Sequence, residues 1–137
     1  MTSTAPRWMQ VLACVCFLTL VTNALRDVFY APARGVEVWF GFEVTGPMAL
    51  LTAPIHWVIL GIGAWGFWTA QPWIVPAAAG YLFYAAFSHL VWSEASPNGR
   101  GWRIGLVQAA AISTAAIAIL RLGRGIRPAR PRVAPPL

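Results

Sequence analysis

The chain has 137 residues, of which 58% are hydrophobic and 10% are charged, against about 25% charged residues in an average soluble domain. The length fits a single domain, and the apolar residues come in long blocks, which excludes an ordinary soluble protein and indicates a lipid environment. The formal net charge is +6, but its distribution follows a membrane topology and not the basic patch of a nucleic-acid-binding protein.

Residues 8–25 form the first apolar block. The block predicts a membrane helix, because about 20 helical residues cross a bilayer core of about 30 Å. A secretory signal cleaved after Ala24 is the alternative interpretation. Cys14 and Cys16 lie about 200° apart around the helix and cannot form a local disulfide. Thr19, Asn23 and Arg26 share one face toward the end of the helix that we predict to lie outside.

Residues 26–46 form the long outer connection, which contains the stretch "GVEVWFGFEVTG". The stretch alternates at first and then becomes aromatic. We interpret it as an interfacial segment whose rings lie in the headgroup region, with Glu37 and Glu43 directed toward water or toward the bundle. Arg26 and Asp27 either pair with one of these glutamates and fix the loop, or act as ordinary interfacial charges.

Residues 48–68 form the second block, and Pro47 suits the first turn of its helix. Thr52 and His56 share a face, and Pro54 frees a backbone carbonyl close to the imidazole. His56 falls near the bilayer centre, where an ionisable side chain is a candidate functional residue. The alternative is a neutral imidazole that is hydrogen-bonded inside the bundle.

Residues 73–92 and 102–120 form the third and fourth blocks. The link "TAQP" is short, so the second and third helices are expected to form an antiparallel hairpin. Polar and aromatic residues of the third helix share one side: Tyr81, Tyr84, Ser88, His89 and Trp92. The fourth helix carries a stripe of small residues suited to close packing: Gly105, Ala109, Ser113 and Ala116. The Arg- and Pro-rich tail, residues 123–137, is predicted to be disordered.

Together these elements predict an all-α bundle of four transmembrane helices in one domain, residues 1–137. Six arginines and no acidic residue lie on the side of the two termini: Arg7, Arg121, Arg124, Arg127, Arg130 and Arg132. Four arginines and all four acidic residues lie on the other side. The positive-inside rule therefore predicts cytoplasmic termini in a cell (inner or plasma) membrane.

Polar faces in lipid turn toward the bundle, so the first three helices are expected to enclose a polar pocket that opens outward and has His56 as its floor. The expected lining is Asn23, Arg26, Thr52, His56, Tyr81, Tyr84, Ser88, His89 and Trp92. The candidates for proton transfer are His56, His89, Glu43 and Glu94. No metal-site spacing is present, and bis-histidine haem is disfavoured because the two histidines differ by roughly 6 Å in depth. The sequence assigns no cofactor.

Two classes of function follow. The first is a small membrane protein that binds a lipid-soluble molecule in this pocket, or an accessory subunit of a membrane complex. The alternative is a membrane-embedded acid–base enzyme, of isomerase or cyclase type, that acts on an isoprenoid or lipid-like substrate. The expected partners are membrane lipid, a hydrophobic small molecule, and a membrane protein or a second copy of the chain, but no nucleic acid.

Overall fold

The computed structural model of the protein describes residues 5–30 and 36–125. It contains four long helices, α1 (Arg7–Phe29), α2 (Pro47–Trp68), α3 (Ile74–Ala95) and α4 (Trp102–Gly123). Two short strands, β1 (Val36–Trp39) and β2 (Phe42–Thr45), lie between α1 and α2 in the sequence. The predicted tail lies outside the described residues from residue 126 onward. The four-helix membrane architecture is confirmed, because every helix is long and apolar enough to cross a membrane.

The helices carry large apolar side chains on their outer surfaces. Leu18, Leu51 and Val107 are each more than 60% exposed. Such exposure is unfavourable in water by about 25 cal/mol per Å² of apolar surface, but it carries no such penalty in lipid. Each helix is therefore built to lie against acyl chains.

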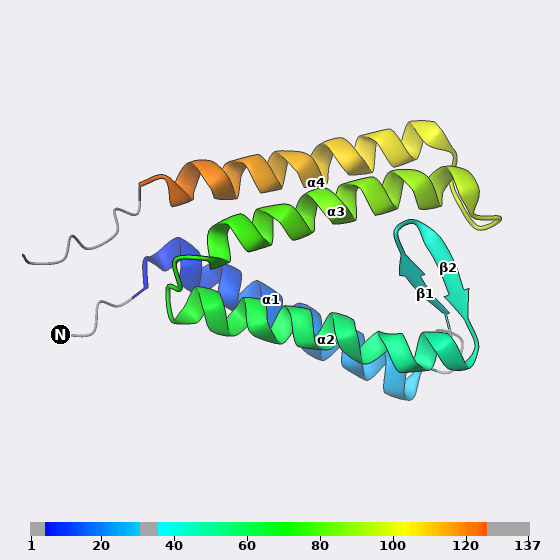
Figure 1. The fold of residues 1–137 in the computed structure, drawn as a ribbon, viewed down its shortest axis with the longest axis horizontal. Coiled ribbons are helices and arrows are strands. Elements are labelled where there is room, and N and C mark those ends of the chain that lie inside the picture. The colour runs from blue at the N-terminus through cyan, green and yellow to red at the C-terminus, as the bar shows by residue number, and fades with distance from the viewer. Residues whose placement is uncertain (1–4, 31–35, 126–137) are drawn as a thin grey trace, which may run out of the picture.

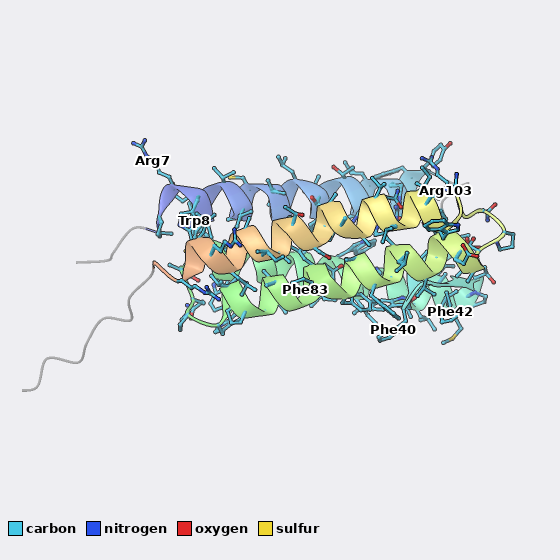
Figure 2. The ribbon with its side chains drawn as sticks, turned by 90° about the horizontal axis from the view of Figure 1, so that it is seen from above. Arg7, Trp8, Phe40, Phe42, Phe83 and Arg103 are labelled. Atoms are coloured by element: carbon cyan, nitrogen blue, oxygen red, sulfur yellow. The ribbon has the colours of Figure 1, made fainter. Side chains whose placement is uncertain are left out.

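Both described ends of the chain lie at one end of the molecule and the strands lie at the other, as Figure 1 shows. We call these the terminal end and the hairpin end. Figure 2 shows Arg7 and Trp8 at the terminal end and Arg103 at the hairpin end. All four acidic residues of the chain belong to the hairpin end: Asp27, Glu37, Glu43 and Glu94.

The helices form two antiparallel pairs, α1 with α2 and α3 with α4. A small core of Met9, Ala13, Phe67 and Ile74 joins the pairs at the terminal end. From there the pairs diverge toward the hairpin end, and the strands lie between them (Figure 1). The two pairs therefore do not close into one compact bundle of directly packed helices.

Small residues hold α3 and α4 together. A Cβ atom added to Gly105 would lie 2.7 Å from the Cβ of Ser93, which is closer than real side chains approach. Ala116 lies about three turns further along the same face of α4 and is fully buried. The predicted small-residue stripe therefore has the packing role expected of it.

The connection interpreted as an interfacial segment is a β-hairpin at its centre. Its strands pair antiparallel, from Val36 opposite Thr45 to Trp39 opposite Phe42. The turn consists of Phe40 and Gly41, with φ angles of 53° and 88°. Positive φ at both turn residues is the type I′ pattern that matches the twist of a hairpin. Gly41 also packs so closely against Val91 of α3 that a Cβ would overlap that side chain.

Three helix ends differ from their predicted positions. The helix α1 continues to Phe29, so Arg26 and Asp27 are helical residues and not part of a loop. The helices α3 and α4 extend to Ala95 and Gly123, about one turn beyond residues 92 and 120. Apolar length alone placed these ends too early, because a helix continues into the polar headgroup region as long as its backbone hydrogen bonds are satisfied.

Candidate functional site

The two faces of the hairpin serve different helices. Side chains alternate along a strand, so Glu37 and Trp39 point to one face and Val38 to the other. Glu43 is opposite Val38 in the register and shares its face. Glu37 and Trp39 on the first face contact α2, and Glu43 on the second face contacts α3, so the hairpin joins the two helix pairs where they diverge.

On the α2 face, His56 is held between a carboxylate and an indole. Its Nδ1 atom lies 3.0 Å from Oε2 of Glu37. Its ring stacks on Trp39, with a centroid separation of 4.3 Å and an interplanar angle of 11°. Glu37 is only 8% exposed. An ionised carboxylate only accepts hydrogen bonds, so Nδ1–H is the donor in this contact, and in a neutral imidazole Nε2 is then an acceptor.

A chain of charges continues from Glu37 toward the hairpin end. The Arg26 guanidinium lies 3.8 Å from Oε1 of Glu37 and 2.6 Å from Oδ1 of Asp27. The other Asp27 oxygen accepts a hydrogen bond of 3.1 Å from the Trp57 indole. This network fixes both carboxylates, and with a neutral His56 its net charge is −1. Of the two roles expected for Arg26 and Asp27, the structure shows the pairing with Glu37.

On the α3 face, Glu43 attaches the hairpin to the end of α3. Its Oε1 atom accepts hydrogen bonds from Ser96 Oγ at 2.6 Å and from Trp92 Nε1 at 2.9 Å, with Asn98 Nδ2 at 3.4 Å. These donors hold the pKa of Glu43 below its ordinary value of 4.5, with the Ser96 hydroxyl as the largest contribution. Glu43 is therefore an ionised anchor of the hairpin.

A pocket of about 260 Å³ lies between the hairpin, α2 and α3. Its lining is Val38, His56, Tyr81, Tyr84, Ala85, Ser88, His89 and Trp92. The Tyr84 hydroxyl accepts a 3.1 Å hydrogen bond from the Phe40 backbone N–H, so its own proton remains available as a donor. We call this the polar pocket. It offers two imidazoles and several hydroxyl groups, and none of its lining residues carries a formal charge with the histidines neutral.

A second cavity, of about 420 Å³, runs between the two helix pairs. Its lining is mostly apolar and comes from all four helices, including Leu12, Val15, Ile59, Ile62, Ala77 and Ile119. We call it the apolar cleft. His56 and Tyr81 line both cavities. The polar pocket and the apolar cleft therefore adjoin at these two side chains.

The structure brings six of the nine expected pocket residues together in the polar pocket: His56, Tyr81, Tyr84, Ser88, His89 and Trp92. The other three lie elsewhere. Asn23 lines the apolar cleft, and Arg26 belongs to the charge network. The Thr52 hydroxyl donates back to carbonyls of its own helix, at 2.9 Å to Met48 and 3.2 Å to Ala49.

The carboxylates expected beside the histidines are placed differently. Glu43 anchors the hairpin to α3, and Glu94 is an exposed residue near the end of that helix. The carboxylate that contacts His56 is Glu37, which was missing from the candidate site. The alternation Val-Glu-Val-Trp carried the signal, because it places Glu37 and Trp39 on one face of a strand. The aromatic residues that follow favoured an interfacial segment instead.

No family model matches the chain, and no curated protein or solved structure shows detectable similarity to it. Among the described residues, no three His, Cys, Asp or Glu side chains are grouped so as to hold a metal ion. The chemistry of the site therefore follows from its own geometry. It consists of a buried carboxylate paired with a half-buried imidazole, beside a polar pocket that adjoins an apolar cleft.

Proposed function

We propose that the protein binds a lipid-soluble small molecule, with the polar part of that molecule in the polar pocket. The observation that carries the proposal is the pocket itself, in which His56, Tyr81, Tyr84 and Ser88 converge within an otherwise apolar body. Ligand sites combine apolar walls with a few well-placed polar groups in this way. A ligand oxygen would exchange hydrogen bonds with the donors and acceptors that these side chains still have free, which would otherwise face an apolar surrounding.

The depth of the pocket supports a ligand that arrives through the membrane. His56 is nine residues after Pro47, the first residue of α2, which places it about 14 Å along the helix axis. That distance is about half of a bilayer core of about 30 Å. A water-soluble ligand would have to lose its hydration to reach this depth, whereas a lipid-soluble one is already there.

The proposed orientation has both termini in the cytoplasm and the polar pocket on the outer half of a cell (inner or plasma) membrane. The charge distribution supports it, because the arginines at the terminal end have no acidic neighbours in the sequence, whereas those at the hairpin end are balanced by four acids. A fluorescent protein that matures only in the cytoplasm, fused at the C-terminus, tests this orientation.

Native mass spectrometry of the full chain, gently extracted from its own membranes, tests binding. We expect a bound small molecule that is retained by the wild type and reduced about fivefold to tenfold in occupancy by Tyr84→Phe, the loss of one hydrogen bond. Tyr30→Phe is the matched control, because Tyr30 is an exposed residue at the end of α1. Equal spectra for both variants, or no bound molecule in any sample, would contradict the proposal. A stoichiometric partner chain in place of a small molecule would instead support the accessory-subunit role.

The Glu37–His56 pair favours a second candidate, acid–base catalysis on an isoprenoid or lipid-like substrate. A carboxylate on Nδ1 orients the imidazole so that Nε2 can accept a proton from a substrate in the polar pocket. His56→Gln separates the two candidates. A binding protein should keep the bound molecule with lower occupancy, whereas an enzyme should retain unchanged substrate and form no product.

A further inference from the structure

The arrangement of the two cavities bears on the class of ligand. This inference rests on the proposed binding function and deepens it. His56 and Tyr81 line both the polar pocket and the apolar cleft, so one molecule can occupy both with its polar and apolar parts. The cleft volume of about 420 Å³ is within the range of roughly 300–1,000 Å³ typical of ligand sites. A polar group alone would leave this space unfilled.

We propose that the ligand is a neutral-headed lipid with a single apolar tail, such as an isoprenoid alcohol, whose head contacts His56 and Tyr81 and whose tail lies in the apolar cleft. A hydroxyl head both donates and accepts hydrogen bonds. It can donate to Nε2 of His56 and accept from the hydroxyl of Tyr81 or Tyr84. The side chains at the junction therefore match a hydroxyl head.

Charge argues against an acidic head. Among the residues that the structure describes, no arginine lines the polar pocket, and Arg26, which lies beside Glu37, is already bound to Asp27 at 2.6 Å. With a neutral His56, the network of Arg26, Asp27 and Glu37 has a net charge of −1, and Glu43 adds a second negative charge on the other face of the hairpin. A phosphate or carboxylate head would enter a negative potential, and the described lining of the pocket offers no arginine to bind it. Phospholipids and fatty acids are therefore poor occupants.

The cleft is open to the bilayer along its length. Among its lining residues, Val15 of α1 and Ile62 of α2 are about half exposed. Both belong to the α1–α2 pair, and Ala77 on α3 faces the same space from the other pair. A tail can enter sideways from the membrane between the diverging pairs, while the hairpin lies between the pairs at the hairpin end (Figure 1).

The test uses the full chain in neutral phosphatidylcholine nanodiscs and geranylgeraniol with a diazirine near the end of its tail. We expect light-induced crosslinks in the cleft segments around Ile62 and Ala77, and we expect Ala77→Trp to abolish them. Ala118→Trp is the matched control, because Ala118 is an exposed α4 residue that lines neither cavity. Unlabelled geranylgeraniol should compete about tenfold better than geranylgeranyl phosphate, from the Coulomb repulsion of charges about 10 Å apart at an effective dielectric constant of about 20.

Three outcomes would overturn the inference. Equal competition by the phosphate would refute the neutral head, and crosslinks that resist Ala77→Trp would refute the tail position. Either result leaves the proposed binding function intact if Tyr84→Phe still weakens competition by geranylgeraniol. Crosslinking that no unlabelled compound saturates would refute the isoprenoid-alcohol class. If native mass spectrometry also finds no bound molecule, the binding function fails as well.

Discussion

Removal of the Glu37 carboxylate should detach the hairpin from α2. Glu37→Ala leaves the Nδ1–H of a half-buried His56 without its acceptor at 3.0 Å and leaves Arg26 with Asp27 alone. A hydrogen bond to a charged group contributes about 1.5–3 kcal/mol. The stacking of Trp39 on His56 contributes about 0.5–1.5 kcal/mol more. This contribution depends on the orientation of the His56 ring, which the Glu37 carboxylate holds. We therefore expect the hairpin to lose about 2 kcal/mol of local stability.

Hydrogen exchange of the intact protein in nanodiscs measures this loss. A loss of about 2 kcal/mol corresponds to roughly 30-fold faster exchange, since 1.4 kcal/mol is a factor of ten. The acceleration should be confined to residues 36–45. Glu37→Gln keeps an acceptor oxygen without the charge, so its effect should be smaller, about fivefold. Glu94→Ala is the matched control, because it removes an exposed carboxylate at the same end of the molecule.

The comparison of these variants has a clear refuting result. If Glu37→Ala and Glu94→Ala accelerate exchange equally, the Glu37–His56 contact does not hold the hairpin. If acceleration extends through α2 and α3, Glu37 stabilises the whole fold, and its assignment to the hairpin is wrong.

Two further predictions concern the attachment of α3. The pKa of Glu43 is lowered in the folded protein, so its contribution to the stability of the hairpin attachment is complete above pH 4.5 and is lost as the pH falls through the lower folded pKa. The indole ¹⁵N–¹H NMR resonance of Trp92 should therefore titrate below pH 4.5. A midpoint at or above pH 4.5 would contradict this prediction. Gly105→Ala should destabilise the α3–α4 pair by about 1–3 kcal/mol through overpacking. Gly80→Ala is the control, because a Cβ there meets no neighbour within 4 Å, and it should leave stability equal or slightly higher. Thermal unfolding in detergent, followed by circular dichroism, compares the two variants, and equal melting temperatures would refute the close approach of α4 to α3 at Gly105.

The four membrane helices follow from the amino-acid sequence alone, because the signal for each is local. A run of about 20 apolar residues has few alternatives in lipid, where the backbone must satisfy its own hydrogen bonds. The same local logic predicted the small-residue contact at Gly105 and the gathering of Tyr81, Tyr84, Ser88 and His89 on one side of α3. Those side chains share a face through helical periodicity alone, whatever that face contacts.

Which carboxylate contacts His56, and where the helix pairs separate, became clear only from the three-dimensional packing. The hairpin turns on Phe40 and Gly41, and a bulky residue at positive φ is rare enough that the sequence does not announce the turn. Once the strands pair, alternation carries Glu37 to α2 and Glu43 to α3, although only six positions separate them. These contacts join residues that are far apart in the chain, so they depend on how separate elements pack, which local hydrophobicity and spacing do not encode.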